Sequence, residues 1–102
     1  MMQRFRIVYT ETARADLIAI GDYIRDAAGD VVADRFIGRV IATVESLETS
    51  PRRYRERPAL GLGIRATGYR KYMIFYRVEQ DSISIVRVLH GARRITANVI
   101  PQ

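Results

Sequence analysis

Apolar residues recur with two different periods along this chain, and the change of period separates strands from helices. Residues 4–10 alternate apolar with polar positions, which predicts a first strand. Two longer stretches then place apolar residues three and four positions apart, which predicts two amphipathic helices on either side of Gly29. Thr10 is a suitable N-cap, Gly29 a suitable stop, and Pro51 ends the second helix. The two stripes consist of Ala13, Leu17, Ile20, Ile24 and Ala28, and of Ala33, Phe36, Ile37, Val40, Ile41, Val44 and Leu47.

The second half of the chain has the pattern of strands. Residues 51–63 are rich in Pro, Gly and Arg and predict a loop, and residues 64–67 predict a short strand that ends in a turn at Gly68. Residues 70–79 and 82–90, separated by Gln80-Asp81, predict an antiparallel β-hairpin. The order β-α-α-β-β-β predicts an α+β fold, in which an αα-hairpin packs on one face of an antiparallel sheet. At 102 residues the chain forms a single domain, with residues 92–102 as a tail of unassigned structure.

Both faces of the predicted hairpin are apolar, although two helices can cover only one of them. Strict alternation from a turn at Gln80-Asp81 places one set of residues on the helix side: Tyr72, Ile74, Tyr76, Val78, Ile83, Ile85, Arg87 and Leu89. The opposite face then carries Met73, Phe75, Arg77, Ser84, Val86, Val88 and His90. Because a solvated sheet face should carry polar residues, we expect a partner to dock there. The alternative is that Ile95, Val99 and Ile100 of the tail fold back over this face.

Charge is the most informative feature of the composition. The chain has 17 Lys and Arg against 11 Asp and Glu, and Lys71 is its only lysine. Residues 51–102 hold eleven of these cations and only three acids. Since the guanidinium group pairs well with phosphates and carboxylates, this half predicts contact with nucleic acid or with an acidic protein segment. The alternative is a solvated basic surface.

The absence of cysteine and the single histidine narrow the possible chemistry. Disulfides, thiol catalysis and cysteine-zinc sites are excluded, and we expect neither a metal nor a cofactor. No apolar run approaches the roughly 20 residues of a membrane span, and residues 1–10 lack the apolar core of a signal peptide. We therefore expect a cytoplasmic protein that makes no membrane contact.

Two sequence runs resemble the ParE branch of the RelE/ParE toxin superfamily. They are RKYMIFYRV at residues 70–78 and IVRVLHGARR at residues 85–94, preceded by Gly63-Ile64-Arg65 at the end of the loop. The resemblance extends over residues 5–94. It implies the toxin of a type II toxin–antitoxin system, neutralised by a small ParD-like antitoxin with a flexible acidic C-terminal segment. It also implies inhibition of DNA gyrase through protein–protein contact, with any DNA contact made indirectly through the complex.

The RelE branch consists of ribosome-dependent mRNA endonucleases, and the chemistry of cleavage separates the two branches. Metal-free RNA cleavage needs a base, an acid and cations around the phosphate. Where the nuclease branch has an arginine, this chain has Met73, whose thioether carries no charge. We therefore favour a toxin without enzymatic activity. The alternative functions are an endonuclease that uses His90, Arg93 and Arg65, and a diverged protein without toxicity.

The predicted partner-binding site combines the second sheet face with the cations around it. It comprises Arg65, Met73, Phe75, Arg77, Val86, Val88, His90, Arg93 and Arg94. His90 is expected to serve structure or partner contact ahead of catalysis. Arg87 is expected to be structural, paired with an acid on a helix, namely Asp16, Asp22 or Glu45.

Overall fold

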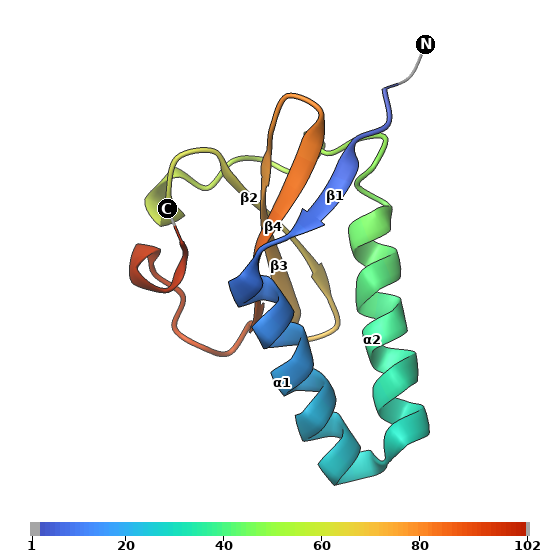
Figure 1. Cartoon of the computed structure of the whole chain (residues 1–102). Helices are drawn as coiled ribbons and strands as arrows, with labels where there is room; N and C mark the ends of the chain where they lie inside the picture. Colours follow the sequence, from blue (N-terminus) through green and yellow to red (C-terminus); the bar gives the residue numbers. More distant parts are fainter. Residues whose placement is uncertain (1–2, 102) are drawn as a thin grey trace.

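The structure is a computed structural model that describes residues 3–101, and it has the predicted order of elements. A four-stranded sheet carries a helical hairpin on one face, and the ends of the two helices project beyond the sheet (Figure 1). The elements are β1 (Arg6–Tyr9), α1 (Glu11–Ala28), α2 (Asp30–Glu45), the 3-10 turn η1 (Pro58–Leu60), β2 (Ile64–Tyr69), β3 (Tyr72–Val78), β4 (Ser82–His90) and the 3-10 turn η2 (Ala97–Val99). The predicted α+β class is confirmed. Within residues 3–101, the helices are too short or too polar to cross a lipid bilayer.

The helical hairpin is shaped by its caps. The Thr10 side chain accepts a hydrogen bond from the Ala13 N–H at 3.1 Å, so α1 begins at Glu11 as the sequence predicts. Gly29 ends α1 and precedes α2 with φ at 91°, a left-handed conformation that favours glycine. Across this tight connection Arg25 pairs with three acids: Asp22, Asp30 and Asp34.

The sheet has the strand order β1-β4-β3-β2 and is mixed rather than wholly antiparallel. The β2–β3 and β3–β4 ladders are antiparallel, whereas β1 runs parallel to β4, with Arg6 opposite Ser82 and Tyr9 opposite Ile85. Because most of the chain separates β1 from β4, no hairpin turn fixes their relative direction. The turn between β2 and β3 also differs from the prediction. It lies at Arg70-Lys71 instead of Gly68, since Tyr69 pairs directly with Tyr72.

A β-bulge in β4 changes the faces that strict alternation predicts. Phe75 pairs with Arg87 but Tyr76 pairs with Ile85, so Val86 is an extra residue. Beyond it the faces are exchanged: Val88 packs in the core beneath the helices and Leu89 packs on the opposite side. The predicted faces are therefore correct on β3 and at the start of β4, and wrong at Val88, Leu89 and His90, whose ring packs against Tyr72 on the helix side.

The sheet has an apolar cluster on each face, and the chain itself covers both. The helical hairpin covers the first cluster, which includes Ile74, Tyr76, Ile83 and Ile85. The tail folds back over the second, where Ile100 is 3% exposed and packs with Ile64, Ala66, Phe75, Val86 and Leu89. Burial of apolar area stabilises by about 25 cal/mol per Å², so an apolar tail attached to the chain is a favourable cover. The expectation that this face is open to a partner is wrong, and the alternative of a folded-back tail is correct.

Candidate partner-binding groove

A hollow of about 850 Å³ lies between the projecting ends of α1 and α2 and the β2–β3 turn. Its base is an aromatic cluster centred on Phe36 of α2. The Phe36 ring packs edge-to-face against Tyr69 and Tyr72, with ring centroids 5.3 and 5.6 Å apart. Tyr72 packs in the same manner against His90 at 5.2 Å. These contacts fix the aromatic rings, so the base of this groove is preformed.

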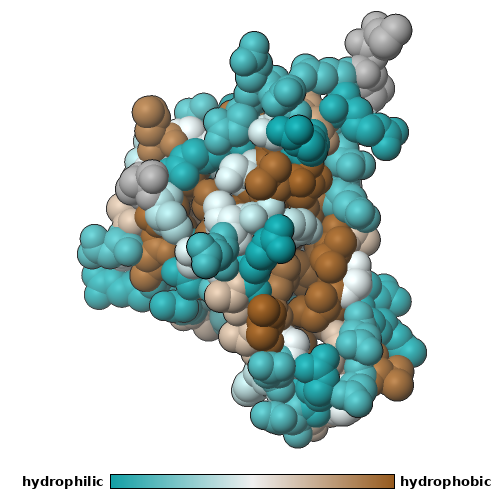
Figure 2. All heavy atoms as spheres, in the orientation of Figure 1, coloured by the Kyte–Doolittle hydropathy of each residue, from teal (hydrophilic) through white to brown (hydrophobic). Residues whose placement is uncertain are grey.

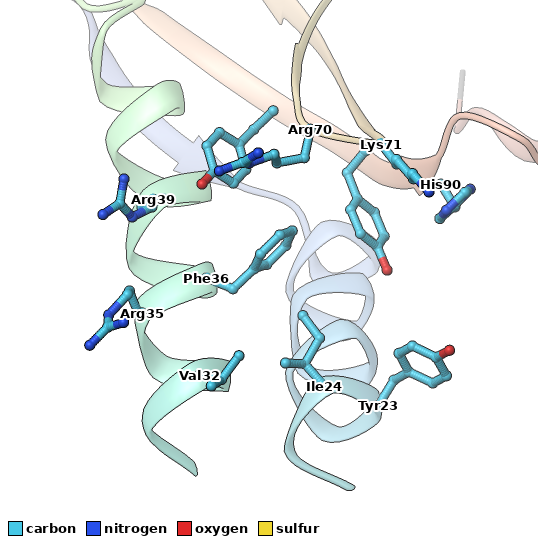
Figure 3. A pocket seen from close by; sticks show the side chains of 11 residues that line it. Tyr23, Ile24, Val32, Arg35, Phe36, Arg39, Arg70, Lys71 and His90 are labelled. Atoms are coloured by element: carbon cyan, nitrogen blue, oxygen red, sulfur yellow. The ribbon is translucent and has the colours of Figure 1, made fainter. Parts of the chain in front are cut away.

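Apolar side chains line the groove between the two helices. In Figure 3, Val32 and Phe36 from α2 point toward Ile24 from α1, and Tyr23 lies on the outer side of α1. Tyr23 is 70% exposed and Val32 is 45% exposed. Large exposed apolar groups around a preformed hollow are typical of an interaction site.

Four permanent cations surround this groove. Arg35 and Arg39 lie at the outer rim, where they extend from the side of α2 away from α1, while Arg70 and Lys71 occupy the β2–β3 turn (Figure 3). Among residues 3–101, no carboxylate lies within 4.0 Å of the charged nitrogens of these four side chains. The groove therefore combines an apolar base with positive charge that the described part of the chain leaves uncompensated.

The β2–β3 turn holds its cations in a defined place. Arg70 has a φ of 57°, and Lys71 accepts a hydrogen bond from the Gly91 N–H at 2.6 Å through its carbonyl. Hydrogen bonding to Arg70 lowers the pKa of Tyr69, with further contributions from the charges of Arg70 and Arg39. A lowered phenol pKa is the expected sign of a strongly positive surrounding.

A second hollow lies between the helices on the face shown in Figure 2, where apolar side chains form a band. Leu17, Ile18, Ile37 and Ile41 line it. Its charges are satisfied within the chain, since Arg25 pairs with Asp22 and Asp34 and Arg14 donates to the Tyr9 carbonyl. Because this second hollow presents no comparable uncompensated charge, the first groove is the better candidate for an acidic partner.

Two of the predicted partner-binding arginines fasten the 51–63 loop to the sheet. Arg65 donates to the Tyr54 carbonyl at 2.6 Å and pairs with Glu56 at 3.5 Å, and its side chain is only 15% exposed. Arg77 donates to the Leu62 carbonyl at 3.1 Å. The structure thus gives both arginines a structural role within the chain.

Three of the four predicted apolar docking residues lie inside the protein, and Met73 is half-buried at a hollow between the 51–63 loop and the tail. Phe75, Val86 and Val88 are each at most 2% exposed, and Met73 packs against the cluster beneath the tail. Phe75 and Val86 lie under the tail, whereas Val88 lies on the helix side because of the bulge. These residues do not form the open surface that the sequence pattern predicts.

The three remaining predicted residues lie at the end of β4 or just after it. The His90 ring lies at the edge of the groove, and its Nδ1 accepts a hydrogen bond from the Ala92 N–H at 3.1 Å. Arg93 and Arg94 are exposed, and no ion pair to them is found within residues 3–101.

The three candidate nuclease residues are not all brought together: the Arg93 N–H donates to the His90 carbonyl at 3.0 Å, but Arg65 lies elsewhere on the sheet. His90 is opposite Tyr72 of β3, whereas Arg65 is opposite Tyr76. Four residues along a strand correspond to roughly 13 Å, and β3 also lies between β2 and β4 in the sheet. Arg65 is also already bonded within the chain. His90 and Arg65 therefore cannot act on one phosphate in this structure.

The sequence pattern contains the groove residues but does not distinguish them from core. Phe36 and Ile24 belong to the predicted helical stripes, and Tyr69 lies between two predicted strands. The available signal was the pair Arg35 and Arg39, one helical turn apart beside Phe36. This pair could be assigned to a groove only once the β2–β3 turn was correctly placed, and the sequence pattern had placed that turn at Gly68.

Comparison with known proteins gives consistent results over most of the chain. The family described as ParE toxin of type II toxin–antitoxin system, parDE, matches residues 7–95. Toxin ParE3 of Caulobacter vibrioides is 24% identical over 94 residues, which cover 92% of this chain and 94% of that protein. The chromosomal ParDE system from P. aeruginosa includes a chain with a TM-score of 0.74 and 24% identity, covering 85% of this chain and 96% of that one. A chain of the toxin–antitoxin complex RelBE2 from Mycobacterium tuberculosis has a TM-score of 0.64 and 23% identity, covering 85% and 98%.

Proposed function

Because the chain belongs to the ParE toxin family of type II toxin–antitoxin systems, we propose that it arrests growth by binding DNA gyrase and that a ParD-like antitoxin neutralises it. It acts through protein–protein contact and performs no chemistry of its own. Any contact with DNA is made through the gyrase complex.

The fold alone does not decide between gyrase inhibition and RNA cleavage. Structural neighbours come from a ParDE system and from a RelBE complex, so the decision depends on individual side chains. The observation that carries the proposal is the separation of His90 from Arg65, which is fastened to the Tyr54 carbonyl and to Glu56. With Arg65 held apart from His90, the array of a base and several cations that metal-free RNA cleavage needs is incomplete.

The partner proposal rests on charge and on the relatives. Both structural neighbours are described as toxin–antitoxin assemblies. Eleven cations against three acids in residues 51–102 suit a partner with an acidic segment. We therefore assign the antitoxin as the first partner and gyrase as the target.

The test is induction of the toxin without antitoxin, followed by assays of both candidate targets. We expect growth arrest, accumulation of cleaved gyrase–DNA complexes, and loss of supercoiling by purified gyrase when the purified toxin is added. Mapping of transcript ends should reveal no new cuts. Messenger cleavage on translating ribosomes that disappears in His90→Ala would overturn the proposal in favour of an endonuclease.

A further inference from the structure

The two edges of the sheet are protected to different extents. At the β2 edge, Glu56 of the preceding loop bridges to Arg65, and the Arg57 N–H donates to the Ile64 carbonyl at 2.6 Å. At the opposite edge, β1 has a neighbouring strand on one side only. An unpaired strand edge is a template for another strand. We infer that β1 pairs with β1 of a second copy of this chain, antiparallel and across a twofold axis.

The outer side of β1 has backbone groups without partners. The N–H groups of Arg6 and Thr10 donate toward β4, each at 3.0 Å. Because successive residues of a strand direct their backbone groups to opposite sides, Ile7 and Tyr9 direct theirs away from the sheet. In the described part of the chain, the N–H and C=O of Ile7 and the N–H of Tyr9 make no hydrogen bond. The Tyr9 C=O accepts one from Arg14 Nε at 3.5 Å and has a second lone pair available.

One register pairs these groups with each other. When Val8 is opposite Val8 of the second copy, Ile7 is opposite Tyr9 of the second copy, and these two residues exchange both N–H···O bonds. The twofold axis makes the same pair a second time, so the bonds of one half repeat in the other. The register that places Ile7 opposite itself needs the Phe5 N–H, which already donates to the Glu48 carbonyl at 2.8 Å. The backbone therefore selects the register centred on Val8.

Side chains around this edge add apolar area to the pairing. Ile7 and Tyr9 pack against the helix-side cluster, so Val8 between them points to the other face, where it is 42% exposed. In the centred register the two Val8 side chains meet, because the Cα atoms of a pair without mutual hydrogen bonds are about 4.5 Å apart. The apolar band between the helices lies on the same side of the molecule as β1 (Figures 1 and 2), and its Ile18 is 65% exposed.

Charge favours a second copy as the partner. The two hollows beside β1 are lined by four arginines and four acids, namely Arg4, Arg6, Arg14, Arg25, Asp22, Asp34, Glu45 and Glu48. This face is therefore formally neutral, although the whole chain carries a net charge of +6. Two chains of the same sign repel each other least through a neutral face, whereas an acidic segment or a nucleic acid is attracted to the cations elsewhere.

Disulfide trapping tests the register, because the chain has no cysteine of its own. Val8→Cys places one sulfur on each side of the axis, and a Cα separation of about 4.5 Å is within the range of disulfides. The matched control is Val31→Cys at the start of α2, where the side chain is 69% exposed and forms disulfides only by random collision. We expect Val8→Cys to form a covalent dimer under mild oxidation at least about ten-fold faster than Val31→Cys.

Sedimentation of the purified, full-length wild type measures the dimer without a crosslink. Since β1 is only four residues long, we expect a weak and reversible dimer with a Kd of about 10 µM. Species larger than the dimer should not form, because a twofold contact uses the edge of both copies. Val8→Lys places two ammonium groups opposite each other and should raise the Kd at least about ten-fold. Val8→Thr is neutral and also β-branched, and should leave the Kd within about three-fold.

Three results would overturn the inference. They are a wild type that remains monomeric at about 300 µM, equal rates of crosslinking for Val8→Cys and Val31→Cys, and a Val8→Lys variant that dimerises like the wild type. Circular dichroism of each variant checks that it is folded, as the exposure of both sites leads us to expect. The inference does not depend on the proposed function, because growth arrest and gyrase inhibition are measured separately from the oligomeric state.

Discussion

Asp16 of α1 and Arg87 of β4 form a two-point ion pair, with Arg87 Nε 2.8 Å from Oδ2 and Nη2 2.7 Å from Oδ1. The side chains are only 11% and 15% exposed. Asp16 also accepts a hydrogen bond from the Val88 N–H at 2.9 Å. Arg87 Nη1 donates a hydrogen bond to the Val99 carbonyl at 2.8 Å. Hydrogen bonding to Asp16 raises the pKa of Arg87, so the guanidinium group stays charged. These bonds join the first helix, the bulged strand and the tail, and they confirm the predicted structural role of Arg87.

Removal of Asp16 should therefore destabilise the protein strongly. Asp16→Ala leaves the largely buried Arg87 without its counter-ion, and the expected loss is about 3 kcal/mol in the free energy of unfolding. Urea unfolding followed by circular dichroism measures it. Asp22→Ala is the control, because that carboxylate is exposed and its loss should change stability by less than about 0.5 kcal/mol. Similar losses in both variants would contradict a special role for the Asp16–Arg87 pair.

The tail should contribute to stability as part of the core. Ile100→Asp places a charge where the side chain is 3% exposed, against Phe75, Val86 and Leu89. We expect a loss of at least about 2 kcal/mol and increased binding of an apolar dye, because the second sheet face is uncovered. Leu62→Asp is the matched control, since Leu62 is 91% exposed. A tail variant as stable as this control would mean that the tail does not cover the sheet in solution.

Local patterns predicted the helices and the order of strands because these depend on residues close together in sequence. The caps at Thr10 and Gly29 illustrate this, since each acts within a few residues of its own position. The bulge at Val86 inserts one residue into β4, and no residue type in the sequence signals it. Strict alternation therefore assigned Val88 and Leu89 to the wrong faces of the sheet. The place of the tail depends on tertiary contacts, and the groove depends on the meeting of three separate elements. No periodicity in the chain encodes either one.

Two glycines of the helical hairpin should respond to alanine in opposite directions. Gly38 lies inside α2, and an added Cβ would meet no atom within 4 Å, so Gly38→Ala should stabilise by about 0.5–1 kcal/mol. Gly29 has a φ of 91°, so Gly29→Ala should destabilise by about 1 kcal/mol through backbone strain. Thermal unfolding of both variants and the wild type checks the pair. A loss of stability in Gly38→Ala would show that this helix face is more crowded than the structure indicates.

Tyr76 should make the protein sensitive to alkali. Its ring is buried, its hydroxyl donates to the Pro51 carbonyl at 2.7 Å, and burial raises its pKa to about 12. The unfolded chain releases this proton near pH 10, so between pH 10 and 12 the folded state binds more protons and stability falls as pH rises. Burial and the charge of Glu45 also raise the pKa of Tyr9, which acts in the same direction.

The variant Tyr76→Phe separates this titration from general alkaline damage. Below pH 10 it should be less stable than the wild type by about 1 kcal/mol, because the hydrogen bond to Pro51 is lost. Its stability should then fall less steeply, so the two curves should cross between pH 10 and 12, because the rise in the pKa of Tyr76 from 10.0 to about 12 costs the wild type more at high pH than the hydrogen bond contributes. Urea unfolding at intervals from pH 8 to 12 measures both curves, and Tyr23→Phe, at a side chain that is 70% exposed, serves as the control. Parallel curves for Tyr76→Phe and the wild type over this range would show that Tyr76 ionises alike in the folded and unfolded chains, contrary to the burial of its ring.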